Sequence, residues 1–326
     1  MTANLTPQYL DAEQRFKQAA TPAERLSALE DMWATLPKHK GTEKLQAEIK
    51  KKLSLARKEL QAKKGPKRLD PSNIPREGAG RVVLTGPPNA GKSALLKALT
   101  RAEPEVAPYA FTTREPQQGM IEWQDIQFQL IDLPALSRQF MEPWVMSVIR
   151  SADLLLVAVD QASAGVLEEI EDAAAFLAEQ KVFLQAPAGE LPRGGAVVPS
   201  LLLLNKMDLA GAGDNAAVVE ELFGGRFTVR RVSAETGEGL EPLKDEIFAR
   251  LGILRVYTKQ PGKPPDQGRP YVLKIGSTVL DLCQMVHHDF VEHLAFARVW
   301  GKQAFDGQRI NRDHVLADGD VIELHR

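Results

Sequence analysis

The segment that most constrains the fold is GPPNAGKS at residues 86–93, which fits the pattern G-x-x-x-x-G-K-[ST]. An apolar, β-branched run at residues 81–85 precedes it, and strong helix formers follow at residues 94–99. A glycine-rich loop between a strand and a helix wraps backbone N–H groups around phosphate oxygens at the positive end of the helix. The sequence therefore predicts a nucleotide-phosphate site made of Gly86, Pro87, Pro88, Asn89, Ala90, Gly91, Lys92 and Ser93.

Two residues of this loop have specific expected roles. Lys92 is placed to reach the β- and γ-phosphates, and the hydroxyl of Ser93 is placed to hold Mg²⁺. The alternative is an accidental glycine-rich turn, which the strand and helix on either side disfavour.

A base-recognition motif follows the apolar run at residues 201–204. It reads NKMD, and in an open α/β sheet ligand groups gather at the carboxyl ends of strands. A carboxylate at Asp208 can accept from both N1–H and the 2-amino group of guanine, a donor pair that adenine lacks. Asn205 can bridge the phosphate loop and the base, and the stem of Lys206 can lie over the ring. The alternative for this motif is a polar turn that follows a strand.

A third segment, Ser233, Ala234 and Glu235, can direct backbone N–H groups at the guanine oxygen.

Two segments between these motifs are candidates for metal binding. Asp132 ends an apolar run, where a carboxylate reaches Mg²⁺ through a water molecule. The YAFTT segment at residues 109–113 offers hydroxyls that can complete the metal shell when a γ-phosphate is present. Taken alone, two adjacent threonines indicate only a β-prone loop.

In this order, GPPNAGKS, YAFTT, DLPA, NKMD and SAE resemble the Obg-related, translation-associated GTPases, and most closely the developmentally regulated GTP-binding (DRG) family. Residues 36–45 resemble the basic helical region before that family's GTPase domain. Residues 255–262, 296–301 and 318–323 resemble parts of its C-terminal TGS domain. The resemblance implies GTP hydrolysis to GDP and action on or near the ribosome. It also implies that Phe111 and Thr112 border the nucleotide and that Thr113 is the threonine that binds Mg²⁺.

The chain departs from the family pattern at two places. Ala135 stands where the family has glycine, which restricts the backbone while keeping its N–H. The next residue, Leu136, occupies the position at which many small GTPases carry a water-orienting glutamine, but a hydrophobic residue there is normal in the branch that the chain resembles. Residues 161–200 are too few for the family's inserted subdomain, which puts contacts made through such an insert in doubt.

Ala135 leaves a second function open, an RNA- or ribosome-associated scaffold that holds GTP with negligible hydrolysis. A third and more distant alternative is an ATP-using P-loop kinase. Asn89 occupies the loop position where related potassium-stimulated GTPases carry asparagine, so it is a candidate potassium ligand. The alternative for Asn89 is that it only stabilises the turn.

Composition and periodicity predict the domain organisation. Residues 1–64 have helical periodicity, and residues 65–80 are rich in Pro and Gly, as linkers are. Residues 81–252 alternate strands and helices, which predicts an α/β GTPase domain with a mainly parallel sheet covered on both faces. Residues 253–326 turn to short strands with a helix near 278–287; the family resemblance implies a β-grasp TGS domain there.

The charge distribution suggests a partner. The chain has 326 residues and a net charge of −2, yet residues 38–68 carry twelve Lys or Arg against three Glu. Such a stretch can neutralise phosphates, and together with the family resemblance it favours ribosomal or other RNA as a partner, bound through the basic N-terminal helices and the TGS domain; a solvated helical face is the alternative. The single Cys283 favours a reducing cytoplasm, and no apolar run is long enough for a membrane span. The sequence predicts no oligomeric state.

Overall fold

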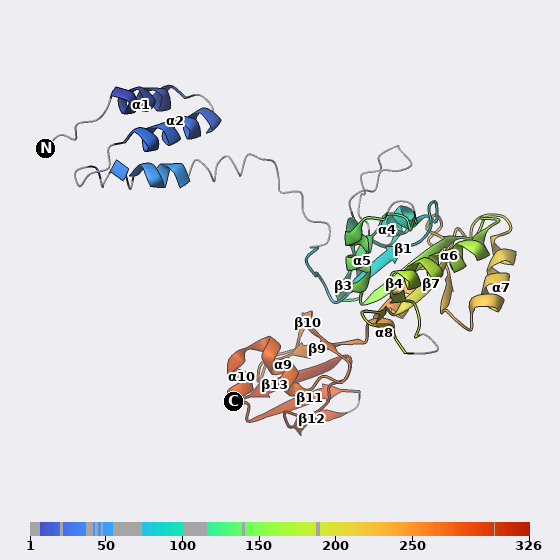
Figure 1. Ribbon diagram of the computed structural model, residues 1–326. Helices are drawn as coiled ribbons and strands as arrows, with labels where there is room; N and C mark the ends of the chain where they lie inside the picture. Colours follow the sequence, from blue (N-terminus) through green and yellow to red (C-terminus); the bar gives the residue numbers. More distant parts are fainter. Residues whose placement is uncertain are drawn as a thin grey trace. The chain divides into compact units, whose positions relative to one another are not determined.

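The computed structural model describes residues 7–19, 22–36, 42, 45–46, 48–54, 74–100, 116–138, 141–186, 190–302 and 304–326. The chain divides into two compact units, residues 1–73 and 74–326 (Figure 1). In the first unit, α1 (Pro7–Gln18) and α2 (Pro22–Thr35) are followed by helical residues 48–54. A small apolar core joins these helices and includes Tyr9, Leu29, Met32, Ile49 and Leu53.

The second unit begins with a six-stranded sheet in the order β2-β3-β1-β4-β7-β8. Its strands are β1 (Arg81–Thr85), β2 (Gln117–Trp123), β3 (Ile126–Asp132), β4 (Leu154–Asp160), β7 (Ser200–Asn205) and β8 (Val229–Arg231). Only β2 runs antiparallel to its neighbour; the other pairs are parallel. The mainly parallel α/β sheet expected from the alternating pattern is confirmed.

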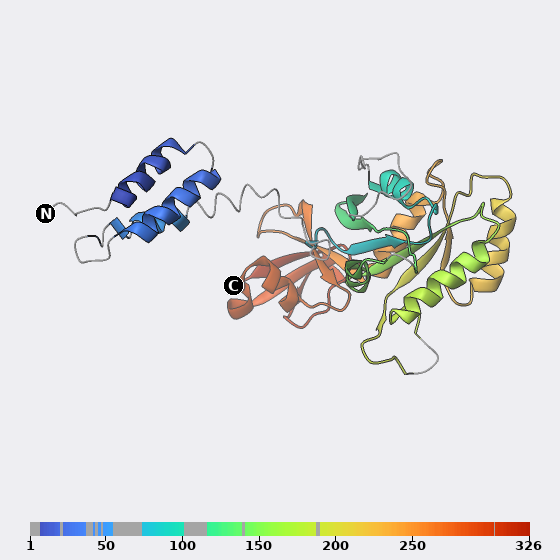
Figure 2. The ribbon, with the colours of Figure 1, turned by 45° about the horizontal axis from the view of Figure 1, so that its top comes forward.

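Helices cover both faces of this sheet because its central strands are apolar on both sides. Val83 of β1 faces a core shared with α5 (Pro143–Arg150), α6 (Val166–Glu179) and α7 (Ala212–Phe223), while its neighbours Val82 and Leu84 face α4 (Lys92–Thr100) and α8 (Leu240–Leu251). Figure 2 shows α6 and α4 on opposite sides of the sheet. Because successive side chains of a strand point to opposite faces, the apolar residues of β1 contribute to the cores on both sides of the sheet. A short parallel pair, β5 (Val182–Phe183) and β6 (Ala196–Val197), follows α6.

The C-terminal part forms a five-stranded sheet in the order β10-β9-β13-β11-β12. Its elements are β9 (Ile253–Thr258), β10 (Asp266–Lys274), α9 (Val279–Val286), α10 (His288–His293), β11 (Phe296–Gly301), β12 (Ala304–Ile310) and β13 (Asp320–His325). β13 and β9 are parallel, and the remaining pairs are antiparallel. The helix expected near residues 278–287 is α9, which begins after a capping box formed by Thr278 and Asp281.

Arg255, near the start of this sheet, contacts both parts of the second unit. Its guanidinium pairs with Asp125 in the β2–β3 turn and with Asp318, each at 2.8 Å, and lies 4.8 Å from the ring centroid of Trp123. The hydroxyl of Tyr257 donates to the same Asp125. None of the described helices is long and apolar enough to cross a membrane.

Candidate functional site

The candidate site lies where four parallel strands end. β1, β3, β4 and β7 run in one direction, so their carboxyl ends meet at one edge of the sheet. Four loops leave this edge. One starts at Gly86, and the others follow Asp132, Asp160 and Asn205, the last residues of β3, β4 and β7. The structure therefore brings together three motifs that are widely separated in the sequence.

The glycine loop depends on two backbone positions that disfavour a side chain. Gly86 has a φ of 142°, and a Cβ there would lie 2.1 Å from the carbonyl oxygen of Ala158 in β4. Gly91 has a φ of 80°, and a Cβ there would lie 2.3 Å from Nδ2 of Asn205. Asn89 also has a positive φ, 62°, and is exposed, while Pro87 and Pro88 lie at the loop surface. Neither glycine has room for a side chain, so the loop can pack closely against the residues of β4 and β7 at this edge.

Gly91→Ala is expected to weaken nucleotide binding because the added methyl group displaces Asn205. The expected cost in unfolding free energy is about 1–3 kcal/mol, from the positive φ and the clash together. Gly211→Ala is a matched control because Gly211 also has a φ of 80° but has no atom within 4 Å of an added Cβ. Urea unfolding and GTP titration of both variants measure the difference. Equal losses in both would show that the contact with Asn205 is unimportant.

Lys92 and Ser93 open α4 at the loop's end. Nζ of Lys92 donates to the carbonyl oxygens of Gly86 at 3.2 Å and Pro87 at 2.8 Å. Burial lowers the pKa of Lys92 to about 8, and the nearby Asp132 opposes that shift. A buried ammonium whose hydrogen bonds, among the described residues, go to two carbonyl oxygens is suited to receive phosphate oxygens.

Asp132 at the end of β3 lies beside Ser93. The Ser93 hydroxyl donates to Oδ2 of Asp132 at 2.8 Å. Oδ1 of Asp132 is buried and, among the described residues, has no hydrogen-bond partner. Burial raises the pKa of Asp132 to about 6, against the effects of Ser93 and Lys92. Two adjacent oxygen ligands, one with unused acceptor capacity, fit a hard cation such as Mg²⁺.

Asn205 joins the three loops at the base end of the site. Its Nδ2 donates to the carbonyl oxygen of Ala90 at 2.9 Å, and its Oδ1 accepts from the backbone N–H of Ala234 at 3.1 Å. The hydroxyl of Ser233 donates to Oδ1 of Asp208 at 2.5 Å. The hydrogen bond to Ala90 is the contact with the phosphate loop that the predicted bridging role of Asn205 requires. Glu235 lies exposed in the turn that follows.

Asp160 is a site neighbour that sequence reasoning missed. It ends β4, and its Oδ2 pairs with Nζ of Lys206 at 2.6 Å. Lys206 has a φ of 64°, and this ion pair directs its side chain across the strand ends. The signal was present in the sequence, because Asp160 closes an apolar strand in the same way as Asp132 does.

Ala135 and Leu136 lie in the loop after β3. The backbone N–H of Leu136 donates to the carbonyl oxygen of Gly86 at 3.0 Å, which ties this segment to the glycine loop. The Leu136 side chain is buried in the core that contains α5 and α6. Leu136 therefore contributes to packing rather than to orienting water.

Several expected site residues lie outside the described residues. These are the YAFTT segment with Phe111, Thr112 and Thr113, and most of the basic stretch at residues 38–68. Lys50, Lys51 and Lys52 are described, and all three are exposed.

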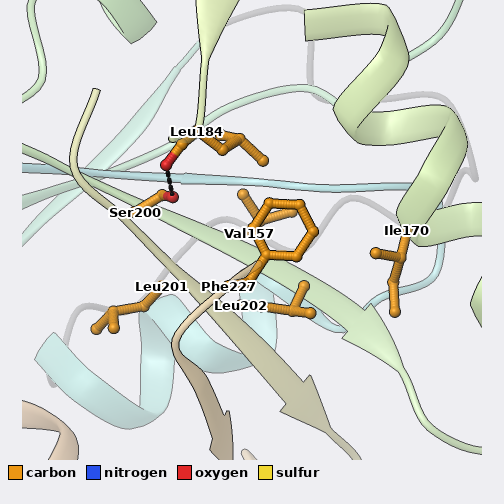
Figure 3. Close-up of a pocket in the computed structure, with 7 residues that line it drawn as sticks. All are labelled: Val157, Ile170, Leu184, Ser200, Leu201, Leu202 and Phe227. Carbon is orange, nitrogen blue, oxygen red and sulfur yellow. Dashed lines mark hydrogen bonds between the residues drawn. The ribbon is translucent and has the colours of Figure 1, made fainter. Parts of the chain in front are cut away.

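Figure 3 shows a different hollow, which lies inside the core of the GTPase sheet. Its lining from β4, β7 and α6 is apolar, and its Ser200 hydroxyl is already bonded to the carbonyl oxygen of Leu184 at 2.9 Å. Ligand sites combine an apolar lining with polar groups that point into the cavity. The lining of this hollow offers no such set, so we interpret it as a small gap in core packing.

Comparison with known proteins agrees with this geometry. A family model described as 50S ribosome-binding GTPase matches residues 81–186, and a TGS domain model matches residues 254–326. An uncharacterised GTP-binding protein of Methanocaldococcus jannaschii is 29% identical over 92% of both chains. The developmentally regulated GTP-binding protein 1 homologue of Dictyostelium discoideum is 26% identical over 92% of this chain and 98% of its own.

Over 92% of its length the chain is similar to developmentally regulated GTP-binding proteins, and it contains a GTPase domain and a TGS domain. The DRG resemblance expected from the motifs is thereby confirmed, as are the P-loop GTPase fold and the C-terminal TGS domain. Among solved structures, a GTP-binding protein of Pyrococcus horikoshii OT3 covers 75% of this chain and 99% of its own, with 15% identity and a TM-score of 0.49.

Proposed function

We propose that this protein hydrolyses GTP to GDP and acts as a nucleotide-dependent switch on or near the ribosome. The observation that carries the proposal is the bridge made by Asn205. It connects the phosphate loop at Ala90 to the expected guanine loop at Ala234. One buried side chain thus fixes the distance between the phosphate and base positions, as recognition of a whole nucleotide requires.

The proposed chemistry is in-line attack of water on the γ-phosphate. The N–H groups of the glycine loop and the ammonium of Lys92 stabilise charge on the phosphate oxygens. Ser93 and, through a water molecule, Asp132 hold Mg²⁺, which when bound neutralises charge on the β- and γ-phosphates. We assign the γ-phosphate-dependent metal contact to Thr113. The loops that contain Thr113 and Asp132 are the segments expected to change between the GTP and GDP states.

A GTP-binding scaffold with negligible hydrolysis is the second candidate. The specific observation in its favour is the buried side chain of Leu136, which leaves this position without a group to orient water. Single-turnover hydrolysis of GTP, with and without ribosomes, separates the two candidates. Hydrolysis that ribosomes accelerate supports the switch, and bound GTP that stays intact under every condition supports the scaffold. Competition by ATP would indicate a P-loop kinase instead.

Potassium is expected to accelerate hydrolysis relative to sodium by at least about tenfold at equal ionic strength. Asn89 is exposed in the phosphate loop, where its side-chain oxygen can ligate a monovalent cation beside the phosphates. Such an ion adds positive charge where other GTPases use an arginine. Asn89→Ala should abolish the difference between the two salts while retaining GTP binding. Equal rates in both salts for the unmodified protein would leave Asn89 with a role in the turn alone.

We propose ribosomal or other RNA as the partner and the cytoplasm as the place of action. The matching family model is described as ribosome-binding, and the exposed Lys50, Lys51 and Lys52 belong to the basic stretch. Binding through phosphates predicts that the affinity for ribosomes falls steeply with salt. Cosedimentation at several salt concentrations measures this slope, and a flat profile would argue against the basic stretch as the contact.

The domain boundaries remain a proposal: a helical region to residue 64, a linker at 65–80, a GTPase domain at 81–252 and a TGS domain at 253–326. The division between the two compact units, after residue 73, falls inside the proposed linker and supports it.

A further inference from the structure

The β2–β3 hairpin, which we call the ribbon, runs from the nucleotide edge of the GTPase sheet to the opposite end of the sheet. Its strands pair from Gln117 opposite Asp132 to Trp123 opposite Ile126. Thr113 precedes Gln117 by four residues in the sequence. The open end of the ribbon therefore joins both segments that are expected to change between the GTP and GDP states, and its turn lies roughly 20 Å away.

The TGS domain holds the turn of the ribbon. The guanidinium of Arg255 donates to Oε1 of Gln124 at 2.6 Å and to Oδ1 of Asp125 at 2.8 Å. The hydroxyl of Tyr257 donates to Oδ2 of Asp125. On the TGS side, the carboxylate of Asp318 accepts from Nε and Nη2 of Arg255. We call these five residues the latch, in which each carboxylate oxygen of Asp125 has a donor from the TGS domain.

The latch is charged and largely removed from water. The side chain of Arg255 is 11% exposed. Burial opposes ionisation of Asp125, but hydrogen bonds from Tyr257 and Arg255 lower the pKa of this carboxyl below its usual value. Burial and the hydrogen bond to Asp125 raise the pKa of Tyr257 to about 12. At neutral pH the latch is therefore an ion pair with a neutral phenol beside it, and loss of one partner leaves a charge poorly solvated.

The turn is strained and packed on its other side against α8. Gln124 has a φ of 49°, in the region that favours glycine. Trp123 stacks on Phe248 of α8 with ring centroids 4.1 Å apart, and its Nε1 donates to Asp245 of α8 at 2.8 Å. The guanidinium of Arg255 lies 4.8 Å from the centroid of the Trp123 ring. The turn is thus held between α8 and the TGS domain, and it can shift only if the latch moves with it or breaks.

We propose that Arg255 and Tyr257 are positioning residues for the nucleotide site, and that the ribbon couples the TGS domain to the bound nucleotide. The inference rests on the proposed function, because the GTP and GDP states of that switch are the states that it couples. The ribbon ends at the proposed metal ligand Asp132 on one side and at the latch on the other, so a displacement of one end reaches the other. Such coupling is reciprocal: if the nucleotide changes the latch, the latch changes the relative affinities for the two nucleotides.

Hydrogen–deuterium exchange of the full chain tests the coupling, with either GDP or a non-hydrolysable GTP analogue bound. Amides of β9 should exchange at rates that differ by about threefold or more between the two nucleotides. Asp125→Asn and Tyr257→Phe should remove this difference, because they release the TGS domain from the turn. Arg230→Gln is the matched control: it removes a 3.0 Å ion pair with Glu246 at β8, the opposite edge strand, and should keep the difference.

Calorimetric affinities provide the reciprocal measurement. Asp125→Asn should change the ratio of GTP-analogue affinity to GDP affinity by about fivefold or more, and Arg230→Gln should leave it unchanged. Tyr257→Phe should change the ratio in the same direction but add nothing to Asp125→Ala, since both remove the same hydrogen bond. If the latch only stabilises the fold, its variants lower the melting temperature while the ratio and the exchange difference stay as in the unmodified protein. That result would overturn the proposal.

Failure of this inference is distinguishable from failure of the proposed function. A protein that hydrolyses GTP but has the same β9 exchange with both nucleotides retains the proposed function and refutes the coupling alone. A scaffold that keeps GTP intact fails the hydrolysis test, yet its GTP and GDP complexes still differ in β9 if the coupling is present.

Discussion

Asp208→Asn is expected to weaken GTP binding by about 100-fold and to strengthen binding of xanthosine triphosphate. The carboxylate of Asp208 is proposed to accept from guanine N1–H and the 2-amino group. Xanthine carries a carbonyl in place of that amine, to which an Asn amide can donate. The Ser233 hydroxyl, 2.5 Å from Oδ1 of Asp208, fixes the carboxylate beside the loop that is expected to approach the guanine oxygen. Calorimetric titration with both nucleotides measures the exchange.

Ser233→Ala is the control for this experiment. It removes the hydrogen bond to Asp208 but keeps the carboxylate, so GTP affinity should fall by no more than about tenfold and the base preference should stay with guanine. If Asp208→Asn leaves the preference for guanine intact, Asp208 is not part of the base site.

The GTPase sheet could be predicted because short segments of the sequence determine its strands. Runs such as residues 154–159 and 201–204 are strand-length and apolar on both sides, which requires helices on both faces. The motifs end these strands, so their meeting at one edge followed from parallel topology. The sequence predicts that Asn205 bridges to the phosphate loop, but not which atom accepts its hydrogen bond, because the carbonyl oxygen of Ala90 lies 115 residues away and its position depends on the path of the glycine loop.

The orientation of individual side chains was harder to foresee. Leu136 stands where many small GTPases carry a water-orienting glutamine; its side chain packs into the core, and its backbone N–H donates to the carbonyl oxygen of Gly86. Lys206 adopts a positive φ and pairs with Asp160, a partner on another strand. Both outcomes depend on neighbours that are distant in the sequence, which local patterns do not encode.

In the TGS sheet, too, the start of a helix could be predicted from the sequence, whereas the pairing of the strands could not. The capping box at Thr278 and Asp281 marks the start of α9 in the sequence itself. The parallel pairing of β9 with β13, which are separated by more than sixty residues, has no local signature. The position of β11 between β13 and β12 likewise has no local signature.

Lys92→Ala is expected to lower the rate of GTP hydrolysis by about 10²- to 10³-fold at saturating nucleotide. Nζ of Lys92 is positioned beside the carbonyl oxygens of Gly86 and Pro87, at the loop that is proposed to enclose the phosphates. No neighbouring cation replaces it within the described part of this loop. Lys97→Ala is the matched control, because Lys97 lies on the same helix but is exposed. Single-turnover hydrolysis measures both variants.

The same side chain predicts a pH dependence. Burial lowers the pKa of Lys92 from 10.5 to about 8, so the free protein loses this charge as the pH rises through 8. Phosphate oxygens bind the charged form, and GTP affinity should therefore decrease above about pH 8. The unfolded chain keeps its proton up to about pH 10.5, so this residue's contribution to the stability of the nucleotide-free fold should improve between those values. Lys92→Ala should remove both trends, while Lys97→Ala should keep them. If the GTP affinity of Lys92→Ala still decreases above about pH 8, another group causes the decrease, and Lys92 does not contact the phosphates.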